Sequence, residues 1–451
     1  MHDYLCIMHN IMRKSPFYQY MIKRIFFFLI AALALLTACS DNDSFTTDRS
    51  HRLTFTTDTV RMDTLFATVP SATYTFWVHN QSGDGLRLRS VRLERSGQSG
   101  FRVNVDGSYL NPVVNNLEIR EGDSIRVFVE VTAFENASAD PQLVEDNLLF
   151  TLESGVEQRV NLRTYSWNAE LWQTVDVTAD QTIESTTPIV VYGGIHVAND
   201  AMLTIKNTEL YFHDGAGITV DGALTVENSL LRGDRLDHMF DYLPYDRVSG
   251  QWKGITVNPH AVGCLLLDSE LRNAMDGIVA DTTTVVLSGS TVHNCKGSGL
   301  WAHDCVVDIQ YSTLSNTLKD CLTLLGCQAT LDHVTLAQFY PLSANRGFAL
   351  RFEPSEQVFS LTCSNTLVTG YAEDVIEGEV DENSKYSFAN CLLRTVVPED
   401  TQFFKDIIWE KKDDDIQGKK HFVLVDEDNM IYDFRLKEES PAYEKKIGNI
   451  Q

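Results

Sequence analysis

Apolar and polar residues alternate in short runs along most of the chain, and beyond residue 188 these runs recur at nearly even spacing. Each repeat has an apolar strand, a small polar pair and another apolar strand. Such alternation predicts β-strands with one face in a core and one in water. The strands after the polar pairs open at Thr208, Ser229, Ser269, Ser290, Ser312, Val334, Asn365 and Cys391, in steps of 21, 40, 21, 22, 22, 31 and 26 residues.

A step near 21 residues is too short for a repeat of two helices and too long for one hairpin. It fits three short strands and three turns, which make one coil of a parallel β-solenoid. The 40-residue step is then one coil with an insertion at residues 232–251. We predict a β-helix over residues 188–445.

Residues 53–165 show the same alternation without the repeat, with turns such as Gln81-Ser-Gly-Asp-Gly and Arg120-Glu-Gly-Asp-Ser between the strands. Several short strands separated by turns at this spacing predict a β-sandwich. Residues 39–52 read as a tether. Residues 166–187 read as a connector, whose Trp167 and Trp172 we expect to cap the first coil. The predicted class is all-β.

The amino terminus carries an export signal. Lys23 and Arg24 precede the apolar run 25–36, and Leu36-Thr-Ala-Cys39 follows. These residues resemble a bacterial lipoprotein signal, in which Cys39 would be lipidated and residues 1–38 removed. An ordinary signal peptide or a short anchor is the alternative. We expect translation to start at Met21, because residues 1–20 are polar, irregular and unlike the front of an export signal; Met1 is the alternative.

The composition excludes some partners. The formal charge of the whole chain is −25, and from Cys39 onward it is −28, from 33 basic and 61 acidic residues. Nucleic acid and anionic membrane surfaces are therefore not expected partners of the body of the protein. Acidic polysaccharides are disfavoured unless a basic patch or divalent cations intervene.

Seven of the nine cysteines lie among apolar residues of the repeats, where they are expected to act as small hydrophobic side chains. One or two disulfides stay open as an alternative. The seven are Cys264, Cys295, Cys305, Cys321, Cys327, Cys363 and Cys391.

The insertion at residues 232–251 is the candidate ligand site, because loops on a rigid scaffold carry most binding residues. Its rings, carboxylates and guanidinium groups are the chemistry that binds sugars. A loop packed by its own rings, with its charges paired together, is the alternative. The candidate residues are Arg232, Asp234, Arg235, His238, Asp241, Tyr242, Tyr245, Arg247 and Trp252.

Catalytic and metal sites are less distinct, and we assign no catalytic residue, no metal ligand and no cofactor. Calcium is the one metal considered, at Asp268, Glu270, Asp276 and Asp281, although acidic turns are usually solvated. His293, His303 and His333 occupy different phases of the repeat, which argues against a metal ladder. In contrast, Asn273, Asn294 and Asn316 share one phase and predict a ladder of stacked amides.

The repeated phrase Gly-x-Leu/Ile-x-Val, as at 222–226, resembles right-handed parallel β-helix proteins, the fold of pectate lyases. With the lipoprotein signal and the preceding sandwich, the chain resembles Bacteroides-type lipoproteins that join an immunoglobulin-like domain to a β-helix. That resemblance implies a lipid-anchored outer-membrane protein, displayed at the cell surface. We expect it to bind a glycan or another surface component without catalysis. A polysaccharide lyase or glycoside hydrolase with its site beside 232–251, or an adhesive structural protein, remain alternatives.

Overall fold

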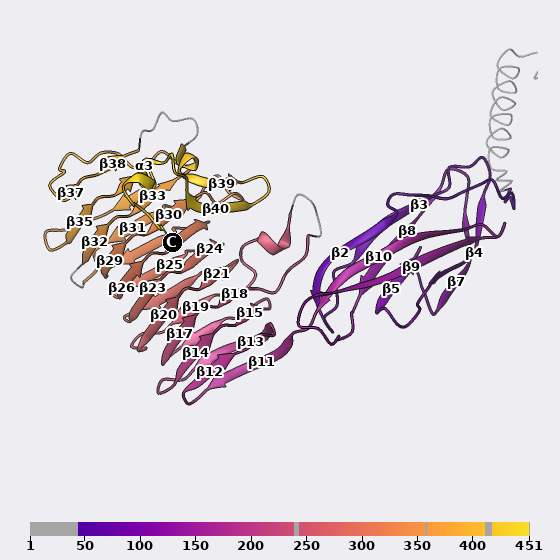
Figure 1. The fold of residues 1–451 in the computed structure, drawn as a ribbon, viewed down its shortest axis with the longest axis horizontal. Coiled ribbons are helices and arrows are strands. Elements are labelled where there is room, and N and C mark those ends of the chain that lie inside the picture. Colours follow the sequence, from indigo (N-terminus) through magenta and orange to yellow (C-terminus); the bar gives the residue numbers. More distant parts are fainter. Residues whose placement is uncertain (1–43, 239–242, 357–358, 411–416, 451) are drawn as a thin grey trace, which may run out of the picture.

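The computed structural model describes residues 44–238, 243–356, 359–410 and 417–450, which form a β-sandwich and a parallel β-helix (Figure 1). The predicted fold class is therefore confirmed. The signal segment, Cys39 included, lies outside the described residues. Within them, no helix has the length and apolarity needed to cross a membrane.

The sandwich has two five-stranded sheets, in the orders β1-β3-β8-β5-β6 and β2-β10-β9-β4-β7. All pairings are antiparallel except that of β2 with β10. Alternate side chains of both sheets meet in one apolar core, which includes Val78, Leu88, Val127 and Phe150. The strands are β1 (Thr54–Phe55), β2 (Thr59–Phe66), β3 (Tyr74–His79), β4 (Leu86–Leu93), β5 (Phe101–Val105), β6 (Ser108–Tyr109), β7 (Val113–Ile119), β8 (Ser124–Val131), β9 (Gln142–Leu152) and β10 (Glu157–Trp167).

The β-helix is built from a ten-stranded and an eighteen-stranded parallel sheet. The ten-stranded sheet takes one strand from each coil: β12 (Gln181–Glu184), β14 (Met202–Lys206), β17 (Ala223–Glu227), β20 (Gly263–Leu267), β23 (Thr284–Ser288), β26 (Val306–Gln310), β29 (Gln328–Asp332), β32 (Ser360–Ser364), β35 (Lys385–Ala389) and β37 (Phe404–Lys405).

The larger sheet bends, so that two columns of strands share it. One column follows the ladder of polar pairs and holds β15 (Glu209–Phe212), β18 (Leu230–Gly233), β21 (Glu270–Arg272), β24 (Thr291–Cys295), β27 (Thr313–Thr317), β30 (Thr335–Gln338), β33 (Leu367–Gly370), β36 (Leu392–Leu393) and β38 (Ile408–Trp409). The other holds β16 (Ile218–Val220), β19 (Ile255–Val257), β22 (Ile278–Asp281), β25 (Leu300–His303), β28 (Leu322–Leu325), β31 (Leu350–Glu353) and β34 (Ile376–Gly378), while β11 (Glu170–Val177) and β13 (Ile189–Val197) run through both.

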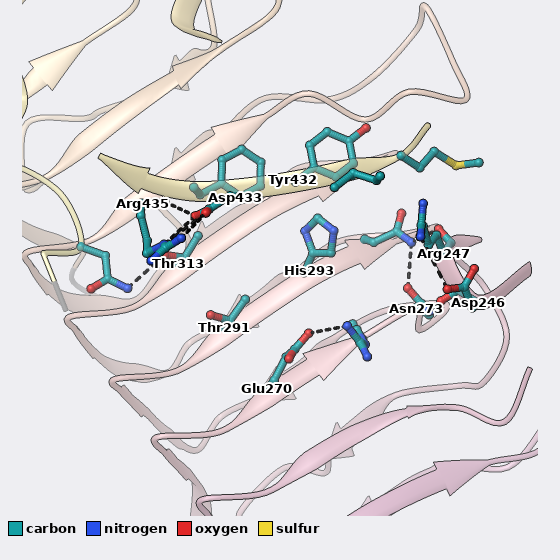
Figure 2. A pocket seen from close by; sticks show the side chains of 16 residues that line it. Asp246, Arg247, Glu270, Asn273, Thr291, His293, Thr313, Tyr432, Asp433 and Arg435 are labelled. Carbon is teal, nitrogen blue, oxygen red and sulfur yellow. Dashed lines mark hydrogen bonds and ion pairs between the residues drawn. The ribbon is translucent and has the colours of Figure 1, made fainter. Parts of the chain in front are cut away.

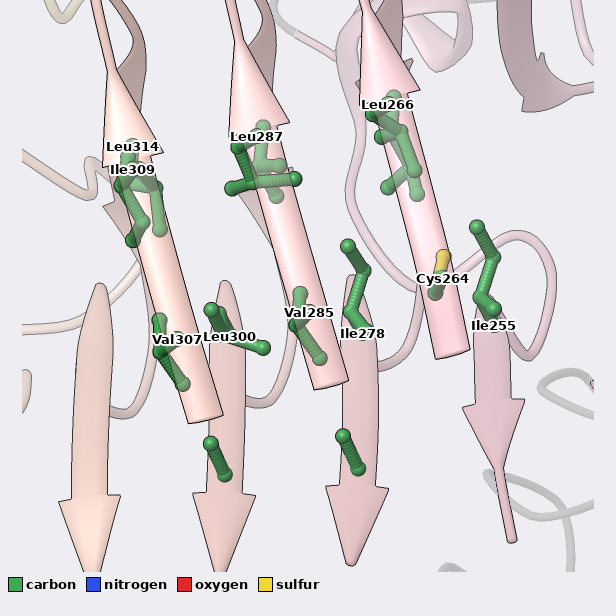
Figure 3. Packing of buried hydrophobic residues seen from close by; sticks show 14 of the residues in the cluster. Ile255, Cys264, Leu266, Ile278, Val285, Leu287, Leu300, Val307, Ile309 and Leu314 are labelled. Atoms are coloured by element: carbon green, nitrogen blue, oxygen red, sulfur yellow. The ribbon is translucent and has the colours of Figure 1, made fainter. Parts of the chain in front are cut away.

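Apolar side chains of like shape stack in the interior of the coils. Ile255, Ile278 and Leu300 lie directly above one another on neighbouring strands, and Leu266 and Leu287 form a second such stack (Figure 3). All five are 1% exposed or less. Burial of a Leu or Ile side chain contributes about 1.5–3 kcal/mol, so these stacks are the main stabilising term of the helix.

A ladder of hydroxyl groups explains the small polar residue that opens the repeats from Thr208 to Ser312. The N–H of Ser229 donates to Oγ of Ser269 (3.1 Å), and the N–H of Ser269 donates to Oγ of Ser290 (3.2 Å). Each hydroxyl in turn donates to the carbonyl two residues before it, as Ser290 does to Ser288 (3.0 Å). Buried backbone donors at the turn are thereby satisfied from coil to coil. The same contacts join Ser185, Thr208 and Ser312 to the ladder.

The residue before each hydroxyl that accepts in the ladder has a positive φ. Asn207 (49°) and Asn228 (46°) are examples, and Asn365 (48°) has the same conformation. The sequence alignment of the repeats placed Asn365 at the position of Ser229. The structure shows that Thr366 is the equivalent residue, because it follows the positive-φ residue and its hydroxyl donates to the carbonyl of Ser364. Asn tolerates this left-handed conformation better than other non-glycine residues do. Its amides also stack, because Nδ2 of Asn228 donates to Oδ1 of Asn207 (2.8 Å).

The second asparagine row is confirmed for two of its three members. Asn273, Asn294 and Asn316 all have positive φ, and Nδ2 of Asn294 donates to Oδ1 of Asn273 (2.8 Å). Oδ1 of Asn316 instead accepts from the N–H of Phe339 (3.1 Å). The predicted amide ladder therefore stops after Asn294.

The β-helix begins earlier than the repeat spacing predicts. Strands β11 and β12 lie within the segment 166–187 that we expected to be a connector, and they form the first coil. Trp172 packs against the coil interior, whereas Trp167 lies at the junction with the sandwich, 6.0 Å from the ring of Phe66 and 6.2 Å from that of Tyr211. The sequence analysis did not recognise β11 as a strand of the repeat, because its outward positions are polar.

The carboxyl-terminal segment does not complete a coil. After β38, η2 (Gln417–His421) leads into an antiparallel hairpin of β39 (Phe422–Asp426) and β40 (Ile431–Leu436), and α3 (Pro441–Glu444) follows. Phe422 and Phe434 pack on Phe339, Leu367 and Leu392, which belong to the outer face of the coils. Figure 1 shows this hairpin beside β30 and β33.

A buried charge cluster fixes this segment to the coils. Oε1 of Glu410 lies 3.4 Å from Nη1 of Arg394 and 3.4 Å from Nε2 of His421, and Oε2 accepts from Thr369 (2.6 Å). Burial acts to raise the pKa of Glu410. The close approach of His421, the hydrogen bond from Thr369 and the charges of His421 and Arg394 outweigh it, and the pKa falls below 4.5.

All seven cysteines of the described residues are free and buried, as expected of small apolar side chains.

We predict that Ser290→Ala lowers the free energy of unfolding by about 1–3 kcal/mol, because it leaves the buried N–H of Ser269 without an acceptor. Denaturant unfolding followed by circular dichroism measures the loss. Ser288→Ala, two residues earlier and outside the ladder, is the control and should change stability by about 0.5 kcal/mol or less. Equal losses in the two variants would reject the ladder as a stabilising feature.

We predict that Glu410→Gln costs about 3–5 kcal/mol at pH 7, because it leaves the charge of Arg394 buried without its partner. A depressed folded-state pKa stabilises the fold above the unfolded pKa, and that stabilisation is lost as pH falls through the folded value. The gap between wild type and variant should therefore shrink below about pH 4.5. Glu118→Gln, the control, removes an exposed partner of Arg87 and should cost far less stability than Glu410→Gln. A gap that does not change with pH would contradict this assignment.

Candidate functional site

A hollow of about 590 Å³ lies on the outer face of the coils, between the insertion and the carboxyl-terminal hairpin (Figure 2). Strands β21, β24 and β27 form its floor, β40 forms one wall, and Asp246 and Arg247 of the insertion form another. We call it the hairpin groove. Its lining residues are Asp246, Arg247, Glu270, Arg272, Asn273, Thr291, His293, Asn294, Thr313, Met430, Ile431, Tyr432, Asp433, Phe434, Arg435 and Asn449.

The floor follows from strand alternation and register. In β21, Leu271 points into the coil, so its neighbours Glu270 and Arg272 point outward. Parallel pairing places Thr291 beside Glu270 and His293 beside Arg272. Two outward rows of polar side chains thus run from coil to coil beneath the hairpin.

The insertion is held over the coils by groups that are themselves buried. Nη2 of Arg232 donates to the carbonyls of Arg235 (2.8 Å) and Asp246 (3.1 Å), and its guanidinium lies over the ring of Tyr211. The amide of Asn273 donates to the same Asp246 carbonyl (2.7 Å). The asparagine row therefore does more than stack, because it also positions the wall of the groove.

The hairpin supplies an aromatic wall. The rings of Tyr432 and Phe434 stack at 5.7 Å, and both meet the imidazole of His293 edge-on, at 5.5 and 6.1 Å. At the corner, Nη1 of Arg247 donates to the carbonyl of Asn429 (2.9 Å). This bond joins the insertion to the tip of the hairpin.

Charges in the groove are balanced in three acid–arginine pairs. Glu270 lies 3.2 Å from Arg272, and Asp246 lies 3.5 Å from Arg247. Asp433 lies 2.5 Å from Arg435. The hydrogen bond from Arg435 holds the pKa of Asp433 below its usual value. Although the chain has a formal charge of −25, the groove itself is locally neutral.

The surroundings of His293 favour the neutral form of its imidazole. Burial, and then the nearby charge of Arg272, lower the pKa of its imidazole to about 3. Its Nδ1 shares a hydrogen bond with Oγ of Ser315 (2.9 Å), which is fully buried. His293 can therefore offer a hydrogen bond or a ring edge to a ligand, but it is not an acid near pH 7.

The structure divides the predicted ligand residues among several places. Arg247 lines the hairpin groove. Arg232 and Trp252 are 5% and 1% exposed, and Trp252 stacks on Phe212 at 4.4 Å. We correct their role from ligand contact to support, because burial leaves them no surface for a ligand. Asp241 and Tyr242 lie outside the described residues.

The remaining candidates face the sandwich. Asp234, Arg235 and Tyr245 line a second hollow of about 520 Å³ between the two domains, the junction cavity. His238 bridges the domains, because its imidazole lies 3.3 Å from Asp63 and 3.0 Å from Asp246. The insertion is thus a shared wall between the groove and the junction.

The predicted acidic residues do not converge on a cation. In the described part of the chain, no three carboxylate, imidazole or thiol groups come close enough to hold a metal ion. Asp276 accepts from the N–H of Ser298 (2.8 Å), and Asp281 pairs with His303 (2.9 Å). Both serve the turns between coils.

Sequence reasoning considered His293 only as a metal ligand, and it did not single out Arg272, Tyr432, Asp433 and Arg435. The first two could have been found by aligning the coils, since they occupy one outward row. The others lie in a segment that we read as the closing coil. Nothing in the sequence of that segment gives its position on the outside of the coils.

No protein-family model matches the chain, and no curated protein matches it. Among solved structures, a family 123 glycoside hydrolase from Clostridium perfringens is 11% identical, with 26% of each chain covered and a TM-score of 0.18. A family 28 exopolygalacturonase from Yersinia enterocolitica is 9% identical, with 75% of this chain and 86% of that chain covered and a TM-score of 0.24. A family 87 α-1,3-glucanase from Streptomyces thermodiastaticus is 11% identical, with 75% and 89% covered and a TM-score of 0.21. Similarity this low says nothing about activity, so function is inferred from the groove itself.

We predict that the imidazole of His293 stays neutral from pH 8 down to about pH 4, because its pKa lies near 3. Histidine NMR signals followed over pH measure this, with His293→Gln to assign the signal. His303 is the internal control, since its hydrogen bond to Asp281 raises its pKa above 6.5. A His293 signal that titrates near pH 6.5 would show that water reaches the ring freely.

Proposed function

We propose that the hairpin groove binds a neutral glycan without turning it over, and that the protein presents this groove at the bacterial surface. The observation that carries the proposal is the combination of an aromatic wall with three acid–arginine pairs around one hollow. Sugar rings have an apolar face that packs on aromatic rings, and their hydroxyls accept from Arg while donating to carboxylates.

The charge balance supports a neutral ligand. Arg247, Arg272 and Arg435 each have a carboxylate within 3.5 Å, so a uronate would compete with three existing ion pairs. The net charge of the chain adds long-range repulsion of anions. A neutral sugar meets neither obstacle.

The electrostatics of Asp433 argue against its acting as the acid of a glycosidase. A glycosidase needs one carboxylic acid whose pKa is raised, so that it can protonate the leaving oxygen. The shift in Asp433 is downward, and His293 is neutral. Hydrolysis or β-elimination is therefore the alternative outcome of the test below.

Surface display would follow from lipidation of Cys39. The polar segment after it would hold the sandwich and the β-helix away from the membrane. The sandwich would then act as a spacer, and its contacts with the insertion would set the direction in which the groove faces.

We predict that the full-length chain binds a neutral polysaccharide on an array that includes inulin, pullulan, linear β-1,3-glucan, β-1,4-xylan and acidic glycans. Tyr432→Ala and Arg272→Ala should each weaken binding at least tenfold, because one removes the ring platform and the other a hydroxyl partner. Thr330→Ala, exposed on the ten-stranded sheet, is the matched control and should bind like wild type.

Shortened or unsaturated products from the bound glycan would make the protein an enzyme and overturn the non-catalytic proposal. The absence of binding to every glycan on the array would overturn the glycan proposal itself and favour an adhesive role. Binding that needs calcium would contradict the reading of the groove as a metal-free site.

A further inference from the structure

The hairpin groove continues into a second hollow along the turns. That hollow, the turn groove, has a volume of about 530 Å³ and shares Glu270 and Thr291 with the hairpin groove. Its other lining residues begin at Ser185 on the first coil. Together, the two hollows cross the coils from Ser185 to Thr313. Five rungs of the hydroxyl ladder span this distance, which is about 24 Å at about 4.8 Å per coil.

One end of this path is closed by the carboxyl-terminal segment. Strand β40 lies across the floor above Thr291 and His293 (Figure 2). On one side, Nδ2 of Asn449 donates to Oγ1 of Thr313 (3.1 Å) and its N–H to Oγ1 of Thr335 (2.8 Å). On the other side, the bond from Arg247 to the carbonyl of Asn429 joins the two walls.

Beyond the hairpin, the described residues leave no open surface along which the two hollows could continue. Ala337, Leu367 and Leu392 lie on the outer face of the following coils and are 1% exposed or less. They are covered by Phe422 and Phe434 in one apolar cluster. A chain lying in the path would therefore have to end at β40.

We infer that the protein binds the end of a linear neutral glycan, with the terminal sugar in the hairpin groove and the following sugars along the turn groove. The inference rests on the proposed function and adds to it the part of the polymer that is recognised. Asp433 and Arg435 meet hydroxyls of the terminal sugar, and Glu209 contacts a sugar nearer the open end. Chain interiors and cyclic glycans do not fit.

Chain length tests this directly. Titration calorimetry of the full-length chain with size-fractionated inulin, pullulan, linear β-1,3-glucan and β-1,4-xylan gives the number of protein molecules per chain. For the polysaccharide that binds, we expect one protein per chain at every length, and a Kd per mole of chains that stays constant once the chain is long enough to reach Glu209. A number that rises with length would overturn recognition of the end and leave glycan binding intact. No binding to any of the four would overturn the proposed function and this inference together.

Two variants distinguish ligand contacts at the closed end of the path from ligand contacts at its open end. Arg435→Ala should weaken binding at least tenfold for chains of every length, since every chain places its end beside this side chain. Glu209→Gln should weaken binding two- to fivefold for long chains and leave disaccharides unaffected, because only long chains reach it. Equal losses for disaccharides and long chains in Glu209→Gln would reject the proposed direction of the chain.

Discussion

The hydroxyl ladder, which runs from Ser185 to Ser312 at one turn of six successive coils, is the constraint on which the position of the insertion and of the groove floor depends. Each rung satisfies a buried N–H of the preceding coil, and so it fixes where that coil turns and which residues face outward. The rung between Ser229 and Ser269 spans 40 residues of sequence and is as short, at 3.1 Å, as the rung between Thr208 and Ser229. The ladder therefore keeps its register across the insertion. This lets residues 232–251 leave the coil without disturbing the stacks above and below.

Three segments far apart in the sequence make the candidate site. The coils supply a floor of outward rows, the insertion supplies one wall, and the last hairpin supplies the other. Buried groups hold each wall to the floor, namely Arg232 and Asn273 under the insertion and Phe422 with the Glu410 cluster under the hairpin. Because these supports are buried and hydrogen-bonded, the groove is preformed, which reduces the entropy lost when a ligand is ordered in it.

The balance of charges in the groove differs from that of the rest of the molecule. The chain as a whole is strongly acidic, which favours solubility and repels anions. Within the groove, each arginine is matched by a carboxylate, and the one histidine is neutral. Paired charges at partial exposure contribute little to folding. In the proposed function, these pairs would instead meet the hydroxyl groups of the ligand.

The sequence by itself determined the all-β class, the sandwich, the coil spacing and the place of the insertion, because these follow from local alternation and from turn residues that recur with each coil. It also placed the free cysteines and two of the three stacked asparagines. The roles of Arg232 and Trp252, the early start at β11 and the closing hairpin were decided by the tertiary structure alone. Aromatic and charged residues look the same in sequence whether they support a loop or face a ligand, and only packing tells which side chains are covered. The strands of the β39–β40 hairpin show the same alternation of apolar and polar residues as the coil strands. The surface on which the hairpin packs is formed by coils that lie up to about 100 residues earlier, so a local sequence pattern cannot predict this contact.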